Sequence, residues 1–200
     1  MPASTKNWVN ANINYPSKKI NLQEISLRYR GDNPINWLSE KKELRIKTRR
    51  NELIDGYRYF DYKIFKADKY LSYYLSDQMS LINQKYDLVE VYVNGESRGL
   101  YIQQEKIDES FLRKNKLMPT NIYKGENHAT EFYIGLNRNL FNNPKIWSKI
   151  SIFNQENKNN TQDLSRFLKL LKSNKYHSDP TIDDNIDLKY FSKFDAFLTI

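Results

Sequence analysis

The sequence predicts an α+β fold, in which a mostly antiparallel sheet with packed helices is followed by the start of a helical lobe. Short stretches between residues 20 and 104 alternate apolar and polar side chains, as strands with one buried face do. An Asn-Gly pair at 94–95 is typical of a hairpin turn. From residue 164 onward, apolar residues recur at helical spacing instead. We therefore place a β-rich region at residues 1–143 and an incomplete helical lobe at residues 144–200.

The composition indicates a folded, basic chain without cysteine. Of the 200 residues, 39% are apolar and 14% aromatic, which is enough for a core. The net charge of +8 favours anionic partners, meaning nucleotides, nucleic acid, anionic lipid or acidic protein. The lack of cysteine excludes disulfides and thiolate metal sites. Because residues 1–8 lack an apolar signal core and no window approaches ~18 apolar residues, we expect neither a signal peptide nor a membrane span.

Two strands are predicted before residue 50. The stretch Ile20–Arg30 carries apolar side chains mostly at alternate positions and ends at a Gly-Asp-Asn-Pro loop. The stretch Lys42–Thr48 also alternates, with Leu44 and Ile46 on one face. Parity places Lys42 on that same face, where its ammonium must either meet an anion or extend into water. The first possibility makes Lys42 a candidate site residue, and the second makes it an ordinary edge lysine.

A third strand and a helix are predicted next. The aromatic stretch Tyr57–Phe65 alternates after an Asp-Gly turn signal. Apolar residues then recur at helical spacing, and we expect Asp68 to cap a helix of about four turns. The apolar stripe expected to lie against the sheet consists of Tyr70, Leu71, Tyr74, Leu75, Met79 and Ile82.

The most informative stretch is a predicted β-hairpin. Its strands are Leu88–Val93 and Gly99–Gln104, with the valines of the first strand on one face. We expect a connection from Asn94 to Gly99, which is longer than a minimal turn. The second strand is followed directly by Glu105, so the hairpin delivers a carboxylate that is a candidate active-site acid.

Helical patterns dominate the second part of the chain. Asp108 is predicted to open a short helix, which ends before a strand at residues 122–125. Residues 127–143 are polar and expected to be irregular. Further helices are expected at residues 164–171 and from Asp187 onward. The last helix reaches the final residue without a glycine, a basic turn or a polar fringe, so we expect a sequence truncated within an apolar helix.

Several common catalytic signatures are absent from the sequence. It contains neither a GxxxxGK[ST] loop nor a GxGxxG loop, so glycines give no support to a P-loop or a dinucleotide-binding fold. His128 and His177 have no histidine at i+4, and a zinc site is unsupported. Without a GxSxG elbow, a serine or cysteine nucleophile triad has no supported member. The acids between residues 183 and 187 are explained by helix capping.

Three segments together resemble the CotH kinase family. They are Arg28-Tyr29-Arg30-Gly31-Asp32, the stretch Lys41–Lys47, and the hairpin from Val91 to its tail Glu105-Lys106-Ile107-Asp108. Their order and spacing fit the family over about residues 25 to 125, and the remainder fits loosely. The family is named for a spore-coat protein and has an atypical protein-kinase-like fold. The members that have been studied transfer phosphate from ATP to protein hydroxyls.

The resemblance implies roles for three residues. Lys42 matches the lysine that faces the nucleotide phosphates, Glu105 matches the acid that ends the second hairpin strand, and Arg30 belongs to the family's RG-N/D loop. Because a paired acid fixes such a lysine on the phosphates, we expect Lys42 and Glu105 to pair. The alternative is two unrelated strand-end charges. The implied cofactors are ATP and Mg²⁺, and the implied partners are a nucleotide and a protein with Ser or Thr acceptors.

The family's catalytic loop and metal-binding aspartates are expected beyond Ile200. We therefore nominate no residue of this chain as a catalytic base or as a metal ligand. The expectation that follows is that these 200 residues alone do not phosphorylate a protein.

Two other functions are compatible with the sequence. A surface adhesion or interaction protein of the same family could use the Arg30-Gly31-Asp32 tripeptide. Nucleic-acid binding is suggested by the charge and by basic residues among the tyrosines from Tyr57 to Tyr74, but a core explains the spacing of these rings, so it is the least favoured function. The acceptor protein, the oligomeric state and the compartment stay open; the resemblance allows the bacterial cytoplasm, the spore coat or the cell surface.

Overall fold

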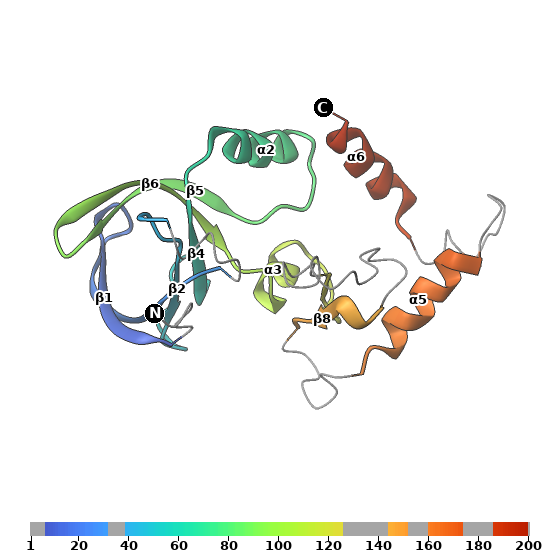
Figure 1. Cartoon of the computed structure of the whole chain (residues 1–200), viewed down its shortest axis with the longest axis horizontal. Helices are drawn as coiled ribbons and strands as arrows, with labels where there is room; N and C mark the ends of the chain where they lie inside the picture. The colour runs from blue at the N-terminus through green and yellow to red at the C-terminus, as the bar shows by residue number, and fades with distance from the viewer. Residues whose placement is uncertain (1–6, 32–38, 126–143, 152–159, 174–185, 200) are drawn as a thin grey trace. The chain divides into compact units, whose positions relative to one another are not determined.

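The computed structural model describes residues 7–31, 39–125, 144–151, 160–173 and 186–199. The chain divides into two compact units, one of residues 1–74 and 83–111 and the other of residues 75–82 and 112–200. The large sheet drawn in blue to green in Figure 1 lies in the first unit, and so do Arg30, Lys42 and Glu105. The first unit therefore contains all three residues for which the sequence predicted a role.

The first unit is built on a six-stranded antiparallel sheet that curls round on itself (Figure 1). The strands lie in the order β1-β2-β3-β4-β6-β5, and a short helix, η1, joins the first two. Their bounds are β1 Val9–Tyr15, η1 Pro16–Lys18, β2 Ile20–Tyr29, β3 Leu44–Thr48, β4 Tyr59–Ile64, β5 Tyr86–Val93 and β6 Glu96–Glu105. With the helices described below, this sheet confirms the α+β class predicted from the sequence.

Two contacts join the beginning of the sheet to its far side. The hydroxyl of Tyr15, at the end of β1, donates to Oε1 of Gln103 on β6 at 2.9 Å. Nζ of Lys18, in η1, lies 3.5 Å from a carboxylate oxygen of Asp87 on β5. The first edge strand is thereby brought close to the opposite side of the same sheet.

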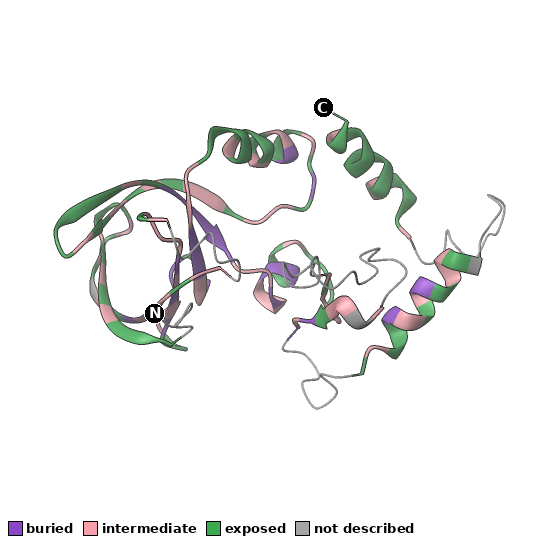
Figure 2. Ribbon diagram, in the orientation of Figure 1, coloured by how far each residue is buried: buried purple, intermediate pink, exposed green. Residues whose placement is uncertain are grey.

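Buried apolar side chains from several strands meet on one face of the sheet. Figure 2 marks buried residues on the ribbon in purple. Side chains alternate along a strand, so Leu44 and Ile46 of β3 point to this face while Arg45 points to the other. The core cluster consists of Ile25, Leu44, Ile46, Ile54, Tyr57, Phe60, Tyr62 and Tyr101. The opposite face, which we call the polar face, carries Arg28, Arg30, Glu43, Arg45, Asp61, Lys63 and Gln104.

The strands predicted before the first helix are present, with shifts at their ends. The prediction for residues 20–30 corresponds to β2, and that for residues 57–65 corresponds to the shorter β4. The prediction for the second strand was wrong at its start, because β3 begins at Leu44 and leaves Lys42 outside. The reason is that β2 ends opposite Leu44 and the chain then turns at Gly31, where φ is 119°, so the ladder stops before Lys42.

The predicted hairpin is formed by β5 and β6, but the prediction of a long connection was wrong. Val93 pairs with Glu96, which leaves only Asn94 and Gly95 in the turn. Both turn residues have positive φ, 52° and 85°, and this type I′ conformation matches the twist of paired strands. The ladder register shifts by one residue further along, and Gly99 has a φ of 75°, as in a bulge that absorbs an extra residue of β6.

Helix α2, Ala67–Gln78, follows β4. The side chains that it packs on the sheet differ in part from the stripe that the sequence predicted. The rings of Tyr70 and Tyr73 pack on Tyr86 of β5, with centroid distances of 5.5 and 5.2 Å. Leu71, by contrast, is 54% exposed. Tyrosine rings therefore decide the orientation of the first turns of α2, and hydrophobicity alone misplaced the stripe.

The chain after β6 is mainly helical in the parts that the structure describes. Its elements are α3 Glu109–Lys114, β7 Tyr123–Gly125, η2 Pro144–Ile146, β8 Trp147–Lys149, α5 Gln162–Ser173 and α6 Leu188–Leu198. Strand β7 confirms the prediction at residues 122–125, and it pairs with β8, which was not predicted. Leu164 and Leu168 are buried on α5, as its spacing predicted. Residues 127–143 lie outside the described residues, and the boundary at 143–144 stays a prediction.

Of the three aspartates predicted to cap helices, two do so. Asp108 Oδ1 accepts from the Ser110 amide at 2.9 Å at the start of α3, and Asp187 Oδ1 accepts from the Tyr190 amide at 2.8 Å at the start of α6. Asp68 lies one residue inside α2, where its charge still complements the helix dipole. None of the described helices has both the length and the apolar character needed to cross a membrane.

Candidate functional site

The antiparallel register aligns charged side chains across the polar face. Arg45 of β3 pairs with Arg28 of β2 on one side and with Asp61 of β4 on the other. Asp61 in turn pairs with Gln104 of β6. Lys63, two residues further along β4, points to the same face because side chains alternate. A carboxylate in the middle of the sheet is thereby surrounded by cations.

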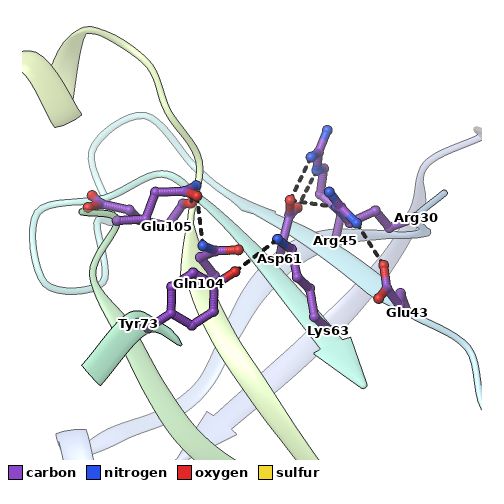
Figure 3. A network of polar contacts seen from close by, with 9 residues as sticks. Arg30, Glu43, Arg45, Asp61, Lys63, Tyr73, Gln104 and Glu105 are labelled. Carbon is purple, nitrogen blue, oxygen red and sulfur yellow. Dashed lines mark hydrogen bonds and ion pairs between the residues drawn. The ribbon is translucent and has the colours of Figure 1, made fainter. Parts of the chain in front are cut away.

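Asp61 is bound by two guanidinium groups, as Figure 3 shows. Arg45 donates from Nε to Oδ1 at 2.5 Å and from Nη2 to Oδ2 at 2.8 Å, and Arg30 donates from Nε to Oδ2 at 2.7 Å. Burial alone would raise the pKa of Asp61, but the hydrogen bonds and charges of Arg45 and Arg30 outweigh it and hold that pKa below its usual value. The carboxylate therefore stays ionised and keeps both arginines in place.

Arg30 is held from two sides. Besides its contact with Asp61, its Nη1 donates to Oε2 of Glu43 at 2.7 Å. Burial lowers the pKa of Arg30, but the two carboxylates raise it further, so the net shift is upward. The predicted site residue Arg30 thus lies on the polar face as a permanent cation in a fixed orientation.

Lys63 is a half-buried lysine that the sequence did not point to. Its Nζ lies 3.4 Å from the hydroxyl of Tyr73 on α2 (Figure 3). Burial, followed by the charge of Arg30, lowers the pKa of Lys63 to about 8. An ammonium that loses hydration and stands near another cation is poised to gain from a bound anion. A signal for it existed in the alternation of β4, where Asp61 and Lys63 share a face two residues apart.

Glu105 ends β6, as predicted, but it lies on the face opposite to Asp61. Figure 3 shows its carboxylate pointing away from the arginines. Only 3% of Glu105 is exposed, and its Oε1 accepts from the Lys85 amide at 2.6 Å. Burial, together with a hydrogen bond to Glu105, raises the pKa of Tyr57. The carboxylate therefore anchors the chain segment that leads into β5.

Lys42 lies two residues before the start of β3, and the Tyr101 hydroxyl donates to its carbonyl oxygen at 3.0 Å. Phe60 of β4 links Ile46 and Glu105 in one row of the ladder, whereas Lys42 precedes Ile46 by four residues. Lys42 also lies outside the strand, so no row of the ladder joins it to Glu105. The pairing of Lys42 with Glu105 stays a prediction, and the ladder does not place them side by side.

The ammonium group of the neighbouring lysine, Lys41, also contacts the hairpin. Its Nζ donates to the Leu100 carbonyl at 2.9 Å and lies 4.5 Å from the centroid of the Tyr101 ring. A Cβ added to Gly99 would stand 3.4 Å from that Nζ. The bulge at Gly99 therefore leaves room for Lys41 to fasten the segment before β3 to β6.

The arrangement suits anions better than metal ions. Both carboxylate oxygens of Asp61 already accept hydrogen bonds from guanidinium groups, whereas Mg²⁺ needs free carboxylate oxygens. Within the part of the chain that the structure describes, no three histidine, aspartate or glutamate side chains could jointly hold a metal. Guanidinium and ammonium groups, in contrast, are the usual partners of phosphate.

Comparison with known families decides the assignment. A family model described as CotH kinase protein matches residues 27–200, which is most of the chain. This chain belongs to the CotH kinase family. The resemblance seen in three segments is therefore confirmed, and the match extends well past the hairpin. No curated protein sequence matches the chain. The CotH match includes the whole cluster around Asp61.

Proposed function

We propose that this CotH family member forms part of a kinase with a protein-kinase-like fold. That kinase transfers phosphate from ATP to Ser or Thr hydroxyls of a protein. Family membership supports a kinase. The observation that carries the proposal is that Asp61 fixes Arg30 and Arg45 on the face that also bears Lys63. Phosphoryl transfer is catalysed largely by positioning and by electrostatic stabilisation, and fixed cations supply both.

The order of the elements supports Lys63 as the lysine that faces the nucleotide. In protein kinases this lysine lies on a strand, and a side chain of the helix after that strand holds it. Lys63 lies on β4, α2 follows β4, and Tyr73 of α2 contacts the lysine. ATP, when bound, supplies the phosphoryl group, and the residues of the polar face orient its phosphates by charge.

Arg30 keeps the nucleotide-binding role that the resemblance implies, because its guanidinium lies in the same cluster. Lys42 and Glu105 also remain proposed nucleotide contacts on the strength of the resemblance. Lys63 is the competing candidate for the phosphate lysine, since it is on the face with the fixed arginines. No described residue is proposed as catalytic base or as Mg²⁺ ligand, so we expect the chain to bind nucleotide without transferring phosphate.

No observation favours the alternative of an adhesion protein. Such a function would need the Arg30 side chain of the Arg-Gly-Asp tripeptide to reach a partner. Its guanidinium instead forms ion pairs with Asp61 and Glu43. The aspartate of the tripeptide lies outside the described residues.

Nucleotide binding to the 200-residue chain tests the proposal directly. Isothermal titration calorimetry with Mg-ATP would compare the wild type with Lys63→Met, Lys42→Met and Lys66→Met. Lys66 is exposed and lies between β4 and α2, so its substitution is a matched control. We expect Lys63→Met to weaken binding at least tenfold and Lys66→Met to change it less than twofold.

Two results would count against the proposal in different ways. If the wild type does not bind Mg-ATP, the nucleotide site is absent from this chain. If only Lys42→Met weakens binding, the assignment by resemblance is right and the one based on the polar face is wrong.

A further inference from the structure

A groove crosses β1, β2 and β3 at the end of the polar face that lies away from Lys63. Its volume is about 550 Å³, within the range of small-ligand sites. Its lining includes the polar side chains of Asn10, Asn12 and Ser26. Tyr59, beside the groove in the ladder, and Lys63 are four residues apart on β4, or ~13 Å. The groove is therefore separate from the proposed nucleotide contacts.

Three cations and one carboxylate line this groove. Arg49 forms an ion pair with the carboxylate, Glu24, and lies 3.8 Å from Glu52. Lys47 and Arg58 are the other two cations, and within the described residues they form no ion pair. The groove thus presents two positive charges that no carboxylate of the described chain balances.

Both of these cations are held in place by aromatic rings. Lys47 Nζ lies 5.8 Å from the centroid of Trp8, and the guanidinium carbon of Arg58 lies 5.4 Å from that of Tyr59. Nε of Arg58 also donates to the Thr48 carbonyl at 3.2 Å. Lys106 approaches the Tyr59 ring as well, at 4.9 Å. Because cations stand over these rings, the rings are poorly placed to stack on nucleic-acid bases.

We propose that this groove binds a phosphoserine or phosphothreonine side chain in an extended segment of a protein. A phosphorylated side chain carries about −1.5 to −2 charges at neutral pH, which balances Lys47 and Arg58. Arginine forks and neutral amide donors such as Asn10 and Asn12 suit phosphate oxygens. The source of the phosphate rests on the proposed kinase function, but the binding itself does not.

Fluorescence anisotropy with a labelled seven-residue phosphoserine peptide tests this proposal on the whole 200-residue chain. Lys47→Gln and Arg58→Gln should each weaken binding at least tenfold. Lys66→Gln removes the same charge from an exposed position outside the groove and should change binding less than twofold. The unphosphorylated serine peptide should bind at least tenfold more weakly than the phosphopeptide.

Nuclear magnetic resonance of the wild type gives a test that needs no variant. The phosphopeptide should shift the amide signals of Asn10, Asn12 and Ser26 more than those of α5. Equal binding by the groove variants and the wild type, or shifts elsewhere, would overturn the proposal. Stronger binding of a single-stranded oligonucleotide at the same residues would overturn it in favour of nucleic acid. Mg-ATP titration of the same samples tests the nucleotide site separately, so a failure of peptide binding can be told apart from a failure of nucleotide binding.

Discussion

Asp61 and Arg45 stand opposite each other on β4 and β3, and their side chains meet in a two-bond contact. The strand pairing brings the two residues together, and Arg30 of the chain after β2 adds a third bond. The polar face therefore has a centre that depends on one carboxylate. Burial of this acid fixes the orientation of both arginines on the polar face.

Replacing Asp61 by Asn should destabilise the chain by about 3 kcal/mol, because two guanidinium groups would lose their anion. We expect the low end of the usual range, since the Arg30 and Arg45 side chains are 29% and 19% exposed. Urea denaturation of both proteins measures the difference. Glu96→Gln, which removes the partner of Arg98 in an exposed pair, should change little. Equal effects of the two substitutions would show that the network does not stabilise the fold.

The turn of the hairpin gives a second prediction. Gly95→Ala should destabilise the chain by about 1 kcal/mol, because φ at this position is 85° and a side chain is strained there. No atom lies within 4 Å of the added Cβ, so the effect comes from the backbone alone. Asn94→Gly, at the other turn position, should be close to neutral. Urea denaturation again provides the measurement, and an unchanged midpoint for Gly95→Ala would contradict the type I′ turn.

How far the sequence could predict this structure depends on whether a feature is local. The strands around Leu44 and Tyr59 and the cap at Asp187 follow from alternation and from capping chemistry, and they are present. The network around Asp61 is not local, because it needs the register of β3 against β4, and no pattern in one strand gives that register.

The candidate site shows the same limit. Parity identified Lys42 as an inward-facing lysine, but it assumed a strand that begins only at Leu44. Lys63 lies in an aromatic strand, and the alternation of such a strand indicates a core and not a site. Only the pairing of β4 with its neighbours shows that Lys63 and Asp61 share a face with Arg30 and Arg45.

A third prediction concerns the anchoring of the segment before β5 by Glu105. Its carboxylate accepts from the Lys85 amide at 2.6 Å, and Gln84 Nε2 donates to its carbonyl at 2.6 Å. Glu105→Ala should therefore speed hydrogen exchange at the Lys85 amide by at least tenfold, whereas Glu105→Gln keeps an acceptor and should have a smaller effect. Exchange followed by nuclear magnetic resonance is the measurement. Unchanged protection in Glu105→Ala would mean that other contacts hold this segment.

The fourth prediction is that Lys63→Met stabilises the chain at pH 7 while it weakens nucleotide binding. Burial lowers the pKa of Lys63 from 10.5 to about 8, so at pH 7 the folded chain keeps an ammonium that has lost hydration. Methionine has a similar length and no charge, and it removes this penalty. A residue that weakens the fold yet serves a ligand is expected at functional sites.

The stabilising effect of Lys63→Met should depend on pH. Between pH 8 and 10.5 the unfolded chain keeps the Lys63 proton and the folded chain loses it, so the contribution of Lys63 to stability rises with pH. The advantage of Lys63→Met over the wild type should therefore be largest at pH 7 and shrink toward pH 10. Urea denaturation at pH 7, 8.5 and 10, with Lys66→Met as the control, measures this change. An advantage that is constant with pH would mean that Lys63 is not desolvated in the folded chain.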